Sequence, residues 1–290
     1  MINRKSDLLD FYAQPGMMTD AGRYSDMLVG LPTKIGALCQ VVQQNLIHVF
    51  WAERYGRTLS DEEKATLNIR PVSHKLALMC QADEQPLTVA RPLERRQVGN
   101  CRDFSLLLTA ILRHQGCPAR ARCGFGAYFI PNHFEDHWVC EYWNAEQGRW
   151  ILVDAQLDDL QQKALGIAFD PLDVPRDQFI IAGQAWQMCR EGRVKPEQFG
   201  IFDMNGWWFI FGDVVRDFLS LNKVEILPWD YEVGFFNHRL EDAYPEDPAE
   251  IAMYDRIAAL TVAGDAAFEE VRKDYNEDPR WRVPKGWIEG

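Results

Sequence analysis

Apolar residues recur at a helical spacing over residues 101–114. They follow the i, i+3, i+4, i+7 stripe of a helix that packs on a core, and they are Phe104, Leu107, Leu108, Ile111 and Leu112. Gly116 and Pro118 come soon afterwards, and both residue types are typical of the end of a helix. The pattern therefore predicts a buried amphipathic helix from Cys101 to His114.

Helical spacing also dominates on both sides of this segment. The N-terminal part is predicted to be mostly helical, with helices over 33–55, from residue 60 onward and over 71–82. Ser60 is followed three residues later by Glu63, which is the pattern of a capping box at a helix start. Further helices are predicted over 178–190, 207–221 and 248–274, and the polar tail 276–290 is expected to be irregular.

Between the two helical regions lie segments with the composition of β-strands. They cover residues 119–129, 137–143 and 150–155, and residues 144–149 have the composition of a turn. Residues 83–100 are polar and are expected to form an irregular approach, whereas 223–228 is predicted as a short strand. A helix followed by antiparallel strands predicts an α+β core, in which the helix packs on the sheet and other helices flank it.

The length of the chain allows one large domain, or a catalytic core with helical additions. We divide the 290 residues into a helical segment 1–69, a core 70–175 and a mostly helical extension 176–290 that packs on the core as one domain. The net charge of −12 argues against nucleic acid as a partner, because affinity for nucleic acid needs a basic face.

The sequence also bears on the compartment of the protein. No apolar stretch has the length of a signal peptide or of a membrane span. The seven cysteines are odd in number and loosely spaced, which favours reduced thiols over a disulfide framework. We therefore expect a cytoplasmic protein without a membrane partner.

The segment from Gly99 to Ser105 carries the candidate chemistry. Cys101 lies in the first turn of the predicted helix, where unpaired backbone N–H groups and the helix dipole favour a negative charge. A thiol at such a position tends to have a lowered pKa, and its thiolate is the nucleophile. The same N–H groups can stabilise an oxyanion, with Asn100 or Gln97 as a candidate second donor. Gly99 would let a substrate carbonyl approach.

His137 and Asp154 are the candidate partners of this thiol. His137 begins a strand and can act as the base, and Asp154 lies in a very apolar strand, where a lone carboxylate is otherwise costly. If an even number of residues connects the two strands, both side chains point to one face of the sheet; an odd number places them on opposite faces. A buried strand histidine and a turn-capping aspartate are the alternative interpretations.

This order of Cys, His and Asp resembles the transglutaminase-like superfamily. The matching blocks are Gly-Asn-Cys-Arg-Asp-Phe-Ser at 99–105, Asp-His-Trp at 136–138 and Trp-Ile-Leu-Val-Asp at 150–154. The resemblance implies a papain-like cysteine-protease fold of rearranged topology and an acyl-thioester on Cys101. It also implies His137 as general base and acid, Asp154 as its orienter, and no cofactor. Hydrolysis of a peptide, protein or small-molecule amide is the favoured reaction.

Two other functions stay open. A crosslinking enzyme would use the same triad but transfer the acyl group of a glutamine to an amine, and a binding module would keep the fold without catalysis. Trp138 is expected in the core or along the substrate channel.

A metal site is not expected. The residues that invite a zinc interpretation are His133, His137, Cys117, Cys123 and Cys140. They lack the spacing of a zinc-peptidase helix or of a zinc knuckle.

Overall fold

The computed structural model of the protein describes residues 4–230, 233, 247–284 and 286–289. The chain divides into two units, the first with Met1–Leu8, Arg122–Trp138 and Pro175–Trp287, and the second with Leu9–Ala121, Val139–Val174 and Ile288–Gly290. The division falls inside strands β3 (Ala119–Gly126) and β4 (Phe134–Asn144), so each of these strands has residues in both units. The three-part division from the sequence stays a prediction.

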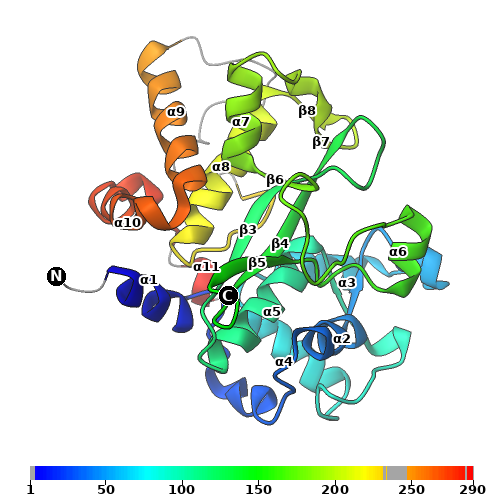
Figure 1. Cartoon of the computed structure of the whole chain (residues 1–290). Helices are drawn as coiled ribbons and strands as arrows, with labels where there is room; N and C mark the ends of the chain where they lie inside the picture. The colour runs from blue at the N-terminus through cyan, green and yellow to red at the C-terminus, as the bar shows by residue number, and fades with distance from the viewer. Residues whose placement is uncertain (1–3, 231–232, 234–246, 285, 290) are drawn as a thin grey trace. The chain divides into compact units, whose positions relative to one another are not determined.

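The second unit is built around the helix that the apolar stripe predicts. This helix, α5, runs from Cys101 to His114, and α2 (Ile35–Asn45) and α4 (Val72–Ala82) lie beside it (Figure 1). Its apolar face joins a core that also contains residues of strands β4 and β5 (Arg149–Val153), among them Cys140, Ile151 and Val153. The predicted packing of this helix on a sheet is therefore confirmed.

Short helices complete the second unit. They are α3 (Asp61–Ala65), α6 (Asp159–Leu165) and the 3-10 helices η1 (Gly22–Leu28), η2 (Ala52–Tyr55), η3 (Thr66–Asn68) and η4 (Leu93–Arg95). Ser60 and Glu63 form the predicted capping box at α3, because each side chain accepts the backbone N–H of the other residue. Helix α1 (Arg4–Ala13) has residues in both units.

Part of the helix predicted over 33–55 is a strand in the structure, and this strand belongs to a two-stranded parallel sheet. The helix ends at Asn45, and β1 (Leu46–His48) pairs with β2 (Gln97–Gly99) in the segment that was expected to be irregular. The prediction of a helix to residue 55 is wrong because this pairing joins segments far apart in the sequence. Local spacing does not contain such information, and the buried apolar residues Leu46 and Ile47 suit a strand equally well.

The first unit contains a group of packed helices. Helices α7 (Ala182–Arg190), α8 (Trp207–Leu221) and α9 (Pro248–Ala263) contact one another (Figure 1). Trp186 lies at their meeting point, with ring centroids 5.1 Å from Trp207 and 5.5 Å from Tyr254. Arg122 of β3 donates to both carboxylate oxygens of Asp217 on α8, at 2.8 and 2.7 Å, and so joins strand and helix.

Within the described residues, the main sheet has six strands in a mixed arrangement. Its order is β6-β3-β4-β7-β8, with β5 paired to β4, where β6 is Phe179–Ile181, β7 is Phe199–Ile201 and β8 is Met204–Asn205. The pair β4–β7 is parallel, whereas β4–β5, β3–β6 and β7–β8 are antiparallel. The expected purely antiparallel sheet is therefore corrected to a mixed one, within an α+β fold.

Several predictions in the C-terminal half are corrected in detail. The expected helix 178–190 begins as strand β6, because residues 179–181 pair with β3. Residues 223–228 form no strand: the N–H groups of Lys223 and Val224 bond back to the end of α8 instead. The expected helix 248–274 is interrupted at Gly264, whose φ of 56° ends α9, and continues through η7 (Gly264–Ala267) into α10 (Phe268–Glu277).

The tail is less irregular than expected. It contains η8 (Pro279–Trp281) and the short helix α11 (Gly286–Glu289), and residues 285 and 290 lie outside the described residues. Another 3-10 turn, η5 (Pro196–Gln198), precedes β7. In the described part of the chain, no helix is both long and apolar enough to cross a membrane.

Close packing of α7 against α9 leads to a prediction about Gly183. A Cβ at this position would lie 2.2 Å from Thr261 Oγ1 and 2.6 Å from the Ala258 carbonyl oxygen. We expect Gly183→Ala to lower the free energy of unfolding by about 1–3 kcal/mol, because the helices must separate to admit a methyl group. Urea unfolding measures this, with Gly286→Ala as control, since a Cβ there meets nothing within 4 Å. Equal stability of the two variants would contradict the prediction.

Candidate active site

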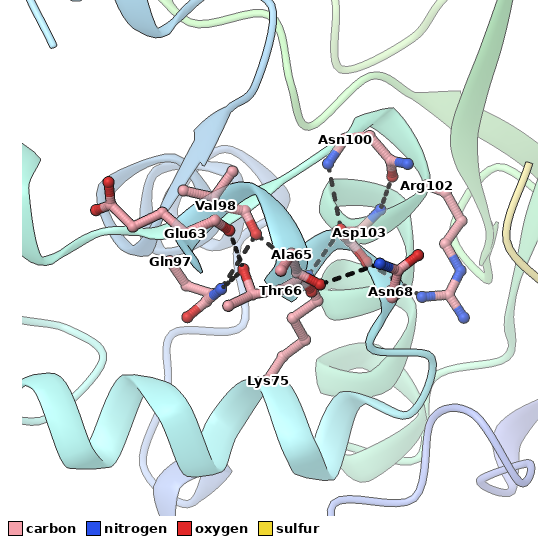
Figure 2. Close-up of polar contacts among 10 residues, drawn as sticks. All are labelled: Glu63, Ala65, Thr66, Asn68, Lys75, Gln97, Val98, Asn100, Arg102 and Asp103. Carbon is pink, nitrogen blue, oxygen red and sulfur yellow. Dashed lines mark hydrogen bonds and ion pairs between the residues drawn. The ribbon is translucent and has the colours of Figure 1, made fainter. Parts of the chain in front are cut away.

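Cys101 is the first residue of α5, as the sequence predicts. Asn100 is the N-cap, and its side-chain oxygen accepts the backbone N–H of Asp103 at 3.2 Å. In return, the Asp103 carboxylate accepts the backbone N–H of Asn100 at 3.2 Å. This reciprocal cap (Figure 2) fixes the start of a 14-residue helix, where the helix dipole favours an anion. Cys101 stands at that start and is 8% exposed.

Asp103 is a buried carboxylate held by two cations. Its Oδ2 lies 3.1 Å from Lys75 Nζ, and its Oδ1 lies 3.1 Å from Arg102 Nη1. Lys75 also donates to the carbonyl oxygens of Thr66 at 2.9 Å and Val98 at 3.1 Å (Figure 2). Burial lowers the pKa of the Lys75 ammonium, and the Asp103 carboxylate acts in the opposite direction.

Gly99 has a packing reason that the sequence does not reveal. A Cβ on this residue would lie 2.9 Å from the Cβ of Asp103 and 3.1 Å from its Oδ2, so the Asp103 side chain occupies that space. A glycine here is what allows Asp103 to fold back onto the N-cap. The expected role of Gly99 in admitting a substrate carbonyl stays a prediction.

The two candidate oxyanion donors differ in their contacts. The side-chain amide of Gln97 donates to Thr66 Oγ1 at 2.7 Å and to the Val98 carbonyl at 3.2 Å. The Asn100 side chain lies directly at the helix start, where its oxygen serves the cap. The Gln97 amide is therefore already engaged, and a contact of Asn100 with substrate stays a prediction.

Asp154 follows β5 directly and is 1% exposed. One carboxylate oxygen accepts the backbone N–H of Gln156 at 3.0 Å, and the backbone N–H of Asp154 donates to the Pro171 carbonyl at 2.9 Å. The bond to Gln156 is the turn cap of the alternative interpretation, which is therefore confirmed as a contact of Asp154. The helix that follows has its own cap, because Asp158 is the N-cap of α6 and accepts from the Gln161 N–H. The carboxylate is thus held in a fixed position in the second unit.

His137 lies in β4 and belongs to the first unit. It is 2% exposed, and its ring lies among aromatic rings, with centroids 4.8 Å from Phe129, 5.9 Å from Tyr128 and 6.4 Å from Phe179. Trp138, the next residue, is fully buried, and its indole nitrogen finds no hydrogen-bond partner among the described residues. A contact of Trp138 with substrate stays a prediction.

The structure thus places the predicted residues in two groups. Gly99, Asn100, Cys101 and Asp154 belong to the second unit, and His137 and Trp138 end a segment of the first unit. The division between the units falls directly after Trp138, inside β4. Convergence of the three triad side chains therefore stays a prediction.

A buried polar cluster in the first unit was missed by the sequence analysis. Cys123, Asp136 and Asp213 each offer one potential ligand atom, and these atoms lie within 4.8 Å of one another. Asp136 Oδ1 and Asp213 Oδ2 have no hydrogen-bond partner in the described part of the chain, whereas Asp213 Oδ1 lies 2.9 Å from Arg216 Nη1. The signal was present in the helix 207–221, where Asp213 and Arg216 interrupt an apolar sequence.

A shared proton accounts for this cluster better than a cation does. Burial, and then the Asp213 carboxylate, raise the pKa of Asp136 well above the usual range. Burial raises the pKa of Asp213 to about 6, although Arg216 acts in the opposite direction. Because Arg216 already neutralises one of the two carboxylates, a single proton satisfies the other, and a divalent cation would meet the repulsion of the guanidinium.

Comparison with known proteins assigns a family to part of the chain. Residues 54–155 match the family model of the transglutaminase-like superfamily, and Cys101, His137 and Asp154 lie in this range. This region is therefore similar to the transglutaminase-like superfamily, and the similarity supports a cysteine-dependent enzyme in general. No curated protein matches the sequence.

One solved structure is similar at a low level. It is the crystal structure of a candidate cysteine protease from Cytophaga hutchinsonii, solved to 1.9 Å, with a TM-score of 0.32 and 17% sequence identity. The match covers 59% of this chain and 44% of that protein, so the chain spans less than half of its length. A similarity of this size says nothing about the site.

The Asp136–Asp213 pair predicts a pH dependence of stability. A carboxyl group with a raised pKa keeps its proton in the folded protein and loses it on unfolding. Its contribution to the free energy of unfolding is therefore complete below about pH 4, the pKa of an unfolded aspartate. The contribution is lost as the pH rises through the folded pKa, which is about 6 for Asp213. Asp136→Asn mimics the protonated carboxyl. We expect its free energy of unfolding to fall by about 1–2 kcal/mol less than that of the wild type between pH 5 and pH 8.

Urea unfolding at the two pH values measures this difference. Asp203→Asn is the control, because Asp203 is an exposed aspartate of the same unit. If Asp136→Asn and the wild type lose the same free energy between the two pH values, the shared proton is absent.

Proposed function

We propose that the protein is a cysteine hydrolase that cleaves an amide bond through a thioester on Cys101. His137 serves as general base and acid, and Asp154 orients its imidazole. The observation that carries the proposal is Cys101 at the capped start of α5, inside the region that matches the transglutaminase-like superfamily. The helix start stabilises a thiolate, which is the form that attacks a carbonyl.

The register of the β4–β5 hairpin supports the pairing of His137 with Asp154. The innermost pair is Asn144 with Arg149, so the four residues 145–148 connect the strands. This number is even, which is the condition for the two side chains to share a face of the sheet. Continuing the same register, Asp154 comes opposite Val139, and His137 is two residues from Val139 on the same strand.

The proposed reaction proceeds in two steps. The Cys101 thiolate attacks the amide carbonyl, and backbone N–H groups of the helix start stabilise the oxyanion. The C–N bond then breaks, and the leaving amine takes a proton from the His137 imidazolium. A water molecule, deprotonated by His137, attacks the thioester; the C–S bond breaks, the carboxylic acid leaves and the thiolate returns. The substrate is a peptide, a side-chain amide or a small-molecule amide.

The other cysteines provide an internal reference for the nucleophile. The described residues include seven free cysteines. Burial raises the pKa of Cys117 to about 11 and the pKa of both Cys140 and Cys189 to about 12. These thiols stay protonated near neutral pH and react slowly with an alkylating agent.

We therefore expect iodoacetamide at about pH 6 to label Cys101 selectively over the other six cysteines. Mass spectrometry after proteolysis gives the site and rate, and Cys101→Ser should abolish the fast phase. Equal labelling of several cysteines, or none at Cys101, would favour a binding module that only retains the fold.

The role of His137 can be tested against a nearby histidine. We expect His137→Gln to slow the alkylation of Cys101 at pH 6 by roughly tenfold or more, because the thiolate loses its cationic partner. His133→Gln is the matched control: His133 lies four residues earlier, where its ring contacts the Gly200 carbonyl at 3.3 Å. Slowing by both variants, or by His133→Gln alone, contradicts the assignment.

The fate of the thioester separates hydrolysis from transfer. Casein as acyl donor and a fluorescent primary amine are the probes, with Cys101→Ser as the blank. A hydrolase releases ammonia or a new carboxylate and leaves casein unlabelled. Incorporation of the amine into casein would identify the crosslinking reaction instead.

A further inference from the structure

The nucleophile helix begins with an electrostatic conflict. Asp103 is needed for the cap, because its carboxylate accepts the Asn100 N–H. The same carboxylate stands two residues from Cys101, in the helical turn that must hold a thiolate. Two anions in one turn disfavour each other and raise the thiol pKa, unless a cation offsets the first one.

Lys75 is placed to offset this charge. It comes from α4, is 3% exposed, and its Nζ lies 3.1 Å from Asp103 Oδ2 (Figure 2). An ammonium has three N–H donors, and the Thr66 and Val98 carbonyls take the other two. Lys75 thus joins three segments, namely η3, the strand that leads to Cys101 and the helix that carries it.

Two charged groups of the described residues pair with Asp103. Arg102 approaches from α5 itself and Lys75 from α4, and Lys75 also donates to the Thr66 carbonyl of η3 and the Val98 carbonyl of β2. Lys75 comes from a different helix, so its pair with Asp103 joins α4 to α5. The same ammonium also donates to the Val98 carbonyl and so anchors β2.

We propose that Lys75 is a positioning residue for the Cys101 nucleophile. Through Asp103 it holds the first turn of α5 in place and cancels the carboxylate charge beside the thiolate. This inference rests on the proposed function, since it assigns to Lys75 a role in keeping the Cys101 thiolate reactive.

The test is the pH profile of Cys101 alkylation by iodoacetamide in four proteins: the wild type, Lys75→Met, Asp103→Asn and the double variant. We expect the midpoint of the alkylation profile to rise by about one pH unit in Lys75→Met, because Asp103 loses one of its two compensating cations and keeps only Arg102. The double variant should return to the midpoint of Asp103→Asn, since an asparagine oxygen still accepts the Asn100 N–H without a charge. Lys64→Met, which removes an exposed lysine 3.8 Å from Asp61, should match the wild type.

Three outcomes overturn the inference. In the first, Lys75→Met keeps the wild-type midpoint; in the second, the double variant shifts as far as Lys75→Met alone. In the third, thermal unfolding shows that neither Lys75→Met nor the double variant folds. If only Lys75→Met fails to fold, a folded double variant with the midpoint of Asp103→Asn still supports it.

The proposed function fails in a different way. If wild-type Cys101 reacts no faster at pH 6 than the same cysteine in urea-unfolded protein, the nucleophile itself is wrong. If wild-type Cys101 is activated and Lys75→Met leaves the profile unchanged, only the role of Lys75 is wrong.

Discussion

The reciprocal cap at the start of α5 is the interaction on which the candidate active site depends. The first turn of this helix is buried, so water cannot satisfy its backbone N–H groups, and the Asn100 and Asp103 side chains must do so. The cap sets where Cys101 stands and which way the dipole of α5 acts on its thiol. Gly99 is tied to the same constraint, because any side chain there would displace Asp103.

Burial of charge follows from this arrangement and recurs elsewhere in the chain. Arg120 with Glu141 and Arg122 with Asp217 are buried ion pairs at 2.6 and 2.7 Å. Removing one partner of such a pair typically costs about 3–5 kcal/mol, because the other charge stays buried and unpaired. The first pair joins strands β3 and β4, and the second joins β3 to α8.

The Asp136–Asp213 pair shows what happens when the charges do not balance. Two carboxylates face one guanidinium, Arg216, and burial together with the Asp213 carboxylate raises the pKa of Asp136, which favours its protonated form. At Asp103 the balance of charge is the opposite. Lys75 and Arg102 supply two cations to one carboxylate, so the Asp103 carboxylate can be tolerated close to the position proposed for a thiolate.

The sequence by itself determined the features that depend on local order. The apolar stripe of 101–114 specified α5, because helical spacing is a property of neighbouring residues, and the turn composition of 144–149 specified the β4–β5 hairpin. The block around Cys101 also pointed to the transglutaminase-like superfamily that the comparison supports. Tertiary structure decided what distant segments do to each other. The pairing of 46–48 with 97–99, the parallel contact of β4 with β7 and the approach of Lys75 to Asp103 leave no trace in local spacing, because their free energy comes from partners far along the chain.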